Sequence, residues 1–542
     1  MQSPVAAKAR VIKLSMDKSN LSRRSFIKSG IFGLTANLLF GGNLIAAAPA
    51  QLVVSLEGNA ADLGQELVSF GVPLPPNFLW DPHRVRAFAA SGEEVRAAVR
   101  SLEPWRIGGR NGSIRSILVQ FRLDFGRNHS QKIRIEFHQP RQKNTTEFEP
   151  VASTLVDPDG FKGPRIYALI PARWLCDSLI VGPQTPATES AEYRPYEDFV
   201  DRNVPGSLGY LKSQIYHEWL FDRSTAYFKM YVRTGEKRFL QAAYEAVHFV
   251  RLHTKTDGDD AGIFILKGAD IKYVYPRAMH IHYLLTGDER ALSTGKLMAQ
   301  YCLKHEDPVY RPQSMVVPPL GVDPERNRQF WTLRNQGYGL LGVLHGWEMT
   351  GDRVFWRKAV ECVDAYVKHQ RRPPDGRPPD GSLRQDWELY DPNEATFKGA
   401  TSPWMMALLL DPLFQYWTLS ADDRVPQLVT RWCDFLDRQG MVPDGSKAYY
   451  VVDCFARPYG GEMGPDMEMH NPEMAYTFAL GCFFTRDPDR LAIYRKRFNR
   501  LFPLAVKLDV NHPARAFNWA FQFSSQLVYF MQHQGGFRSV KR

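Results

Sequence analysis

Polar and aromatic side chains recur at the same place in successive segments of the second half of the chain, near the start of each helix predicted there. Their types suit proton transfer, stabilisation of negative charge and stacking on flat apolar faces. The residues assigned to catalysis are Tyr338, Arg334, Asn335, His217, Tyr275 and Glu218. The residues assigned to substrate binding are Arg277, His280, Trp404, His470 and Asn471. This recurrence predicts one shared binding site.

One chemistry that fits these residues is eliminative cleavage of a uronic acid polymer. That reaction removes the proton next to a carboxylate, so it needs a Tyr, His or Lys as base and a cation or amide to stabilise the resulting charge. Tyr275 or Tyr338 is expected to be the base, with Arg334, Asn335 and His217 as stabilisers. Arg334, Asn335 and Tyr338 share one helix face, because residues three and four apart are neighbours. A polysaccharide lyase is therefore the favoured hypothesis.

Two alternatives remain open. A glycoside hydrolase needs two carboxylates across the scissile bond, and Glu218 is expected to pair with one of Asp386, Glu388, Glu394 or Glu468. A non-catalytic periplasmic glycan-binding protein would hold a polymer at the same place without cutting it. The segment 371–397, with two Pro-Pro-Asp-Gly runs, is long enough to form a lid over the site.

The elements that must position these residues are marked by an internal repeat. An aromatic-rich helix ends in a Thr-Gly turn followed by an acidic residue, at Gly235, Gly287 and Gly351, with looser copies after Trp417 and Phe484. The glycine suits the left-handed position that closes one helix, and the acidic residue caps the next. The repeat predicts five to six helical hairpins over residues 203–542, closed into an α/α toroid with the starts of its inner helices at one mouth.

Residues 51–202 show a different pattern. Hydrophobic and polar residues alternate with a period of two, as in the segments 51–56, 114–125 and 132–137, and Gly, Pro and Asn separate these segments. This pattern is typical of short antiparallel strands. We expect an N-terminal β-barrel or sandwich domain ahead of the toroid.

Residues 1–50 have the features of a twin-arginine signal peptide. Arg23 and Arg24 precede a weakly apolar stretch that ends in Ala48-Pro49-Ala50. We expect export by the twin-arginine translocase to the periplasm, with secretion as a further possibility. Removing this segment's seven basic residues and one acidic residue lowers the formal charge of +10 to +4, so a nucleic-acid partner is not expected.

The six cysteines form no CxxC pair and no Cys/His metal spacing. No metal site and no other cofactor are predicted, although a divalent cation such as calcium is compatible with either reaction. The expected partner is a polysaccharide or oligosaccharide substrate.

Two motifs of the N-terminal part carry a family resemblance. These are Val68-Ser-Phe-Gly-Val-Pro-Leu-Pro75, and Trp105 followed by Gly112-Ser-Ile-Arg115. With the helical repeats, they resemble the exo-rhamnogalacturonan lyase-like family. The resemblance implies a β-barrel domain followed by an α/α toroid and a carbohydrate-active enzyme. The family's central β-sandwich has no room between residues 140 and 205, and no catalytic residue is carried over.

Overall fold

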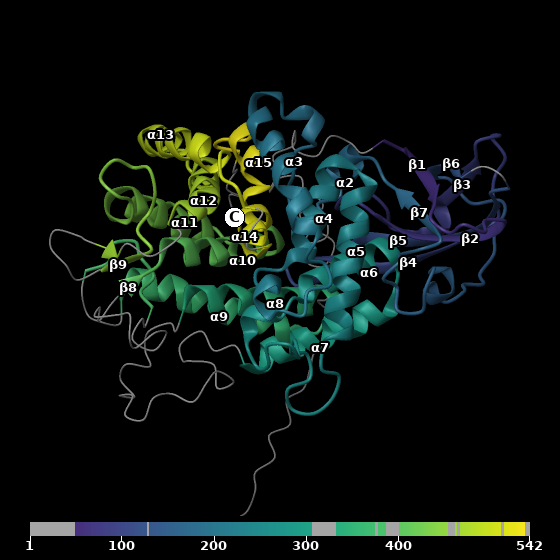
Figure 1. The fold of residues 1–542 in the computed structure, drawn as a ribbon, viewed down its shortest axis with the longest axis horizontal. Helices are drawn as coiled ribbons and strands as arrows, with labels where there is room; N and C mark the ends of the chain where they lie inside the picture. The colour runs from purple at the N-terminus through teal and green to yellow at the C-terminus, as the bar shows by residue number, and fades with distance from the viewer. Residues whose placement is uncertain are drawn as a thin grey trace, which may run out of the picture.

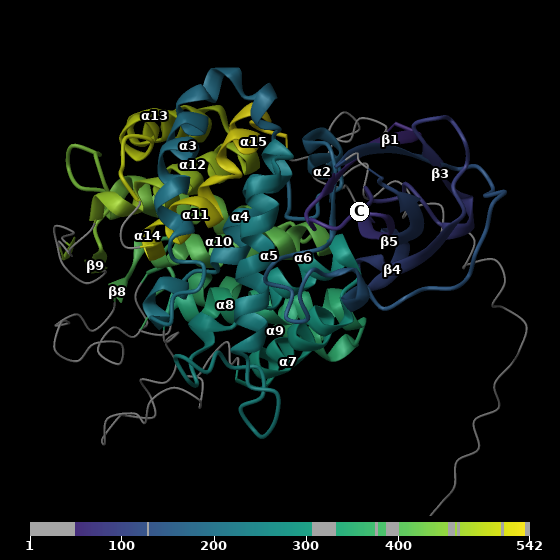
Figure 2. The same cartoon turned by 45° about the vertical axis from the view of Figure 1, so that its right-hand side comes forward.

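The computed structural model describes residues 49–126, 129–305, 332–373, 378–385, 400–453, 461–462, 467–510 and 514–536. The expected signal peptide lies outside them except for its last two residues. In Figures 1 and 2 the strands β1 to β7 gather at one end of the molecule, and the helices lie beside them. The chain therefore divides into a β domain and a helical domain.

The β domain contains two antiparallel sheets. One has the strand order β3-β6-β1-β7 and the other β2-β5-β4. Their bounds are β1 (Gln51–Gly58), β2 (Gln65–Pro73), β3 (Val85–Ala89), β4 (Ala97–Ile107), β5 (Arg110–Asp124), β6 (Ser130–Phe137) and β7 (Ile166–Leu169). Along β1 the side chains of Leu52, Val54 and Leu56 are buried and those between them are more exposed, which is the alternation of a strand with one face in the core.

The helical domain is built from paired helices. The inner members are α4 (Arg223–Thr234), α6 (Pro276–Thr286), α8 (Leu333–Thr350), α10 (Pro403–Ser420), α12 (Asn471–Phe484) and α14 (Ala514–Ser524). The outer members are α3 (Arg194–Leu208), α5 (Lys237–Leu252), α7 (Glu289–His305), α9 (Arg353–Arg371), α11 (Arg424–Phe435) and α13 (Pro488–Ala505). Two short helices, α2 (Ala172–Asp177) and α15 (Leu527–Gln532), complete the set in the described ranges.

The inner helices form a closed ring. Each contacts the next in chain order from α4 to α14, and α14 contacts α4 again. The ring confirms the predicted toroid of helical hairpins. Every residue of α12 is buried, as expected for a helix that is surrounded by other helices.

The Thr-Gly turns close the inner helices as predicted. Gly235, Gly287 and Gly351 adopt φ values of +71°, +73° and +70°, a left-handed conformation that glycine adopts without a steric penalty. In the looser fourth copy Ala421 takes the same place with a φ of +56°. Asp352 then caps α9 by accepting a hydrogen bond from the Val354 N–H.

The helical part begins earlier in the chain than the sequence pattern indicated. The expected boundary at residue 202 falls inside α3, and α3 packs against α14 as the outer helix that completes the ring. Pro195 and Pro205 both lie in this helix, and proline normally indicates a helix end or a loop. The sequence pattern therefore did not identify α3, the outer helix that pairs with α14.

The β domain covers the end of the toroid that carries the Thr-Gly turns. β2 and β5 lie against α6, where the Ser116 hydroxyl donates to the Leu284 carbonyl at 2.7 Å. Because all inner helices run in the same direction, their N-terminal ends face away from the β domain. That far end carries the remaining short strands, β8 (Ala400–Thr401), β9 (Val451–Asp453) and β10 (Gly461–Glu462). In the described part of the chain, every helix is too short or too polar to cross a membrane.

Candidate functional site at the N-terminal mouth of the toroid

A pocket of about 800 Å³, open solvent included, lies where the inner helices begin. Its residues come from the short helices η5 (Tyr216–Trp219) and η6 (Ile271–Tyr273), from α8, α10 and α14, and from the segments between them. The lining comprises Tyr216, His217, Leu220, Lys267, Lys272, Tyr273, Arg334, Trp404, Tyr450, His470, Arg515 and Trp519. Aromatic and cationic side chains therefore dominate the lining.

One wall is a stack of flat rings. The His470 ring lies parallel to Trp404, with 4.6 Å between ring centroids and an interplanar angle of 9°, and it is tilted by 30° against Trp519 at 5.0 Å. Tyr450 adds a fourth ring, 5.6 Å from Trp404. Because the rings pack on one another, with exposed fractions of 3% for Trp404, 4% for His470 and 9% for Trp519, they form a largely buried aromatic wall with a small apolar surface at the pocket.

Cations lie over these rings. The Arg334 guanidinium is 5.4 Å from the Trp404 centroid and that of Arg515 is 5.2 Å from Trp519. Lys267 Nζ is 4.8 Å from the ring of Tyr216. None of the described residues that line the pocket is a carboxylate. The described lining is therefore positively charged and suited to an anionic ligand with an apolar face.

The positive charge changes the protonation of two groups. Partial burial lowers the pKa of His217, and Arg515 and Lys267 lower it further. Its imidazole is therefore neutral at pH 7 and able to accept a proton. Burial also lowers the pKa of Lys272 to about 8, with Arg334 contributing and the ion pair to Asp270 at 3.2 Å opposing.

The pocket brings together four of the residues expected from sequence, namely His217, Arg334, Trp404 and His470. They come from three hairpins and from the segment before α4, and His217 is the most exposed of the four.

The two expected tyrosine bases lie beneath the pocket instead of lining it. The Tyr275 hydroxyl is 2.8 Å from the carbonyl of Trp219 and 2.7 Å from that of Lys272, and it accepts from the Phe221 N–H at 3.1 Å. It therefore ties η5 to η6. Tyr338 is buried against Phe221, and burial raises its pKa well above the ordinary value.

Three further expected residues are also buried outside the lining. Asn335 lies in the first turn of α8, where its N–H and its amide oxygen are both bonded to the Thr332 hydroxyl. Glu218 is buried with a carboxylate oxygen 3.9 Å from the Arg223 guanidinium. Asn471 is buried at the start of α12. These placements favour roles in supporting the mouth.

Arg277 and His280 belong to a different buried group that lies deeper along the ring. Arg277 forms an ion pair with Asp411 and lies 3.3 Å from His345. His280 contacts His345 at 2.9 Å and Glu103 of the β domain at 2.8 Å. His280 is one turn beyond the start of α6, so its side chain lies towards the domain junction and away from the mouth.

The carboxylates expected for hydrolysis are not gathered in the described part of the site. Glu468 forms an ion pair with Lys447 on the surface. Asp386, Glu388 and Glu394 lie outside the described residues, as does much of the expected lid.

The lining residues that were not expected from sequence include Lys267, Lys272, Arg515 and Trp519. Lys272 lies three residues before Tyr275, which was expected at the site, so its position in the sequence could have identified it. Arg515 and Trp519 belong to α14, whose hairpin is completed by α3 from the other end of the helical domain. Because no Thr-Gly turn marks this hairpin, the repeat did not predict that its residues would lie at the mouth.

A search of protein families found no match for the chain, and neither did a search of curated proteins. Among solved structures it is similar to an unsaturated glucuronyl hydrolase from Bacillus sp. GL1, at 15% identity and a TM-score of 0.40, over 61% of this chain and 90% of that one. It is also similar to a cellobiose 2-epimerase from Bacillus thermoamylovorans, at 15% identity and a TM-score of 0.39, over 55% and 75%. A polysaccharide lyase matches at 12% identity and a TM-score of 0.31, over 85% and 59%. Because these TM-scores are low, the evidence for the ring of helices is the set of contacts between the chain's own helices.

Proposed function

We propose that this protein is an enzyme that cleaves a uronic-acid-containing glycan by β-elimination in the pocket at the N-terminal mouth of the toroid. The observation that carries the proposal is the combination of Arg334 and Arg515 over the aromatic wall of Trp404, His470 and Trp519. A uronate has an apolar ring face and a carboxylate, which match these two features.

In this scheme Arg334 and Arg515 bind the uronate carboxylate and stabilise the negative charge that spreads onto it when the neighbouring C–H bond is broken. His217 is the base, because its imidazole is neutral at pH 7 and exposed at the pocket. It takes the proton from C5, the electron pair forms the C4=C5 double bond, and the C4–O bond breaks. The departing oxygen is protonated by solvent or by a nearby phenol such as Tyr216.

This assignment differs from the expectation for Tyr275 and Tyr338. The Tyr275 hydroxyl is engaged with backbone groups, and Tyr338 is buried below Phe221. We therefore assign both a supporting role, together with Asn335 and Glu218. The resemblance to the exo-rhamnogalacturonan lyase-like family also favours a carbohydrate-active enzyme, and the twin-arginine motif favours a periplasmic site of action.

The test is an incubation of the purified protein with a panel of acidic polysaccharides and their neutral counterparts. Ultraviolet absorbance of the conjugated double bond and new reducing ends are followed in parallel. The proposal expects both signals with acidic polymers. New reducing ends without absorbance would replace it with hydrolysis, and binding without either signal would replace it with a glycan-binding role.

A variant pair sharpens this test. His217→Gln is expected to abolish turnover while leaving binding of the polymer intact, because glutamine keeps a polar side chain but cannot take the proton. The exposed Arg194→Ala, at the surface of α3, is the matched control and should behave as the wild type. Full activity of His217→Gln would remove histidine from the role of base.

A further inference from the structure

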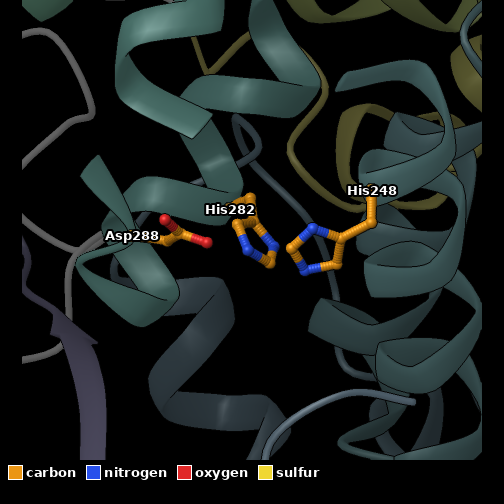
Figure 3. A group of neighbouring side chains, drawn as sticks. All are labelled: His248, His282 and Asp288. Carbon is orange, nitrogen blue, oxygen red and sulfur yellow. The ribbon is translucent and has the colours of Figure 1, made fainter. Parts of the chain in front are cut away.

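A second group of chemically competent side chains lies at the opposite end of the toroid, beside the β domain. His248 from α5, His282 from α6 and Asp288 from the turn before α7 each offer one ligand atom, and these atoms lie within 4.8 Å of one another. All three residues are buried. Figure 3 shows His282 between the carboxylate of Asp288 and the ring of His248.

The repeat places two of the three residues. His282 is in the last turns of α6, and Asp288 follows the Thr-Gly turn that ends this helix. His248 comes from the neighbouring outer helix, with its ring at 82° to that of His282 and 5.0 Å away. Three helices therefore meet at this group.

One nitrogen of the group has no partner among the described residues. His282 Nδ1 is fully buried and makes no hydrogen bond there. A buried polar atom without a partner costs on the order of 1–3 kcal/mol, so its position requires an explanation. A bound ion would provide one.

The donor types suit a divalent cation. Two imidazole nitrogens and one carboxylate oxygen bind metals when the imidazoles are neutral and the carboxylate is ionised. Two guanidinium groups flank the site: Arg251 lies 3.4 Å from His248 Nδ1, and Arg290 forms an ion pair with Asp288.

Asp288 retains capacity for a further ligand. Its Oδ1 accepts from the backbone and side chain of Arg290 at 3.0 Å each, and its Oδ2 accepts from the guanidinium at 2.8 Å. A carboxylate has about four acceptor sites, so one remains on Oδ2. The same arginine holds the carboxylate in place, as outer contacts do in known metal centres.

A comparable cluster in the ring is filled by its own hydrogen bonds. His280 is bonded to both His345 and Glu103, and Glu348 pairs with Arg115 and Gln415. That group has no free nitrogen of the kind found at His282, so it is not assigned a ligand.

We propose that His248, His282 and Asp288 bind one divalent transition-metal ion of the zinc class. This donor set suits Zn²⁺ and its first-row neighbours. Bonds of about 2.0–2.2 Å require the ligand atoms, which lie within 4.8 Å of one another here, to move closer together. The group lines a small cavity of about 20 Å³, shared with Ser69, Thr154 and Tyr167, which is enough for one water molecule that would complete the coordination.

The ion would have a structural role at the domain junction. It would join α5, α6 and the start of α7 at a point where β2 and the segment before β7 line the same cavity. Because binding to the folded state alone stabilises it, the ion is expected to raise the melting temperature. The site is separate from the pocket of the proposed function, so its test is independent of catalysis.

The test uses the purified full chain, stripped with a chelator and titrated with Zn²⁺ by calorimetry and with Co²⁺ by visible absorption. We expect one ion per chain, ligand-field bands of a nitrogen- and oxygen-bound cobalt, and a higher melting temperature with either metal. Absence of binding in the stripped protein would overturn the proposal.

Two variants test His282 and Asp288 as ligands, and a third is the control. His282→Gln and Asp288→Asn are each expected to weaken binding more than about 10-fold, the smallest loss typical even of outer-shell changes. Asp288→Asn retains a capping side chain for α7, so it reports on the metal where His282→Gln fails to fold. His253→Gln, at the end of the same α5, is the control and should bind normally. If Asp288→Asn binds Zn²⁺ and Co²⁺ as tightly as the wild type does, the proposed metal site is wrong.

Discussion

Arg334 shows how one side chain can serve both binding and chemistry in the proposed reaction. It lies in the first turn of α8, is placed over Trp404 and lowers the pKa of Lys272 by its charge. Its guanidinium is planar and can hold a carboxylate with two hydrogen bonds, which a lysine cannot do. The residue therefore combines recognition of the uronate with stabilisation of the developing charge.

We predict that Arg334→Ala lowers kcat on an acidic polymer by about 100-fold, as for loss of one donor to a developing oxyanion. Arg334→Lys should have a kcat between those of Arg334→Ala and the wild type, because lysine keeps the positive charge but lacks the planar pair of N–H donors of a guanidinium. Steady-state kinetics on the purified variants provide the measurement. Equal activity of wild type and Arg334→Ala would remove Arg334 from the reacting site.

The protonation of His217 sets the pH dependence. Burial and the charges of Arg515 and Lys267 lower its pKa below the ordinary histidine value of 6.5. A base is active only when it is unprotonated, so kcat/KM should stay constant near pH 7 and fall as the pH drops through this lowered pKa. A pH–rate profile tests this, and an acid limb centred above pH 6.5 would contradict it.

At the scale of elements, the contact of β2 with α6 depends on a glycine. A Cβ atom on Gly71 would lie 2.1 Å from the carbonyl oxygen of Leu284. The three nearest atoms all belong to the backbone of Leu284 and Leu285 and cannot rotate away as a side chain can. A methyl group on Gly71 must therefore push β2 away from α6. Gly71 belongs to the motif that carried the family resemblance.

We predict that Gly71→Ala lowers the free energy of unfolding by about 1–3 kcal/mol, the usual cost of overpacking. Gly64→Ala is the matched control, because a Cβ atom there meets nothing within 4 Å. Equilibrium denaturation followed by circular dichroism gives both values. A loss for Gly71→Ala no larger than that for Gly64→Ala would show that the two domains are not in such close contact.

At the scale of the whole molecule, the ring is closed by elements from opposite ends of the helical domain. α3 and α14 pack together, and α3 is tied to α4 by a buried ion pair between Glu197 and Arg233. Glu197 also accepts a hydrogen bond from the Ser190 hydroxyl at 2.8 Å. Closure of the toroid therefore depends on an early segment of the chain.

Removing one partner of this buried pair leaves the other charge uncompensated. We predict that Glu197→Ala lowers the free energy of unfolding by about 3–5 kcal/mol. Asp198→Ala, which removes the exposed partner of Arg194, should cost about 0–1 kcal/mol. Chemical denaturation separates the two, and similar losses would show that α3 contributes little to closure.

Much of this architecture is encoded locally. The alternation of buried and exposed residues along β1 indicates a strand. The Thr-Gly turns at Gly235, Gly287 and Gly351 mark the hairpins, because a left-handed residue commonly ends one helix and an acidic residue commonly caps the next. The starts of the inner helices that end in these turns could thus be located from sequence. His217, Arg334, Trp404 and His470 were assigned to one mouth on that basis alone.

Only the tertiary structure decided which neighbours of these starts face the pocket. Tyr275 directly precedes α6 and Tyr338 lies just over one turn into α8, yet neither lines the pocket, because helix rotation and packing determine the direction of a side chain. Trp519 comes from α14, far along the chain from the first helices of the ring, and His248, His282 and Asp288 come from the neighbouring α5, α6 and the turn before α7, which bring them together only by packing. The local pattern of hydrophobic residues determines where each helix and strand forms. Contacts across the ring, in contrast, depend on how all the elements pack together.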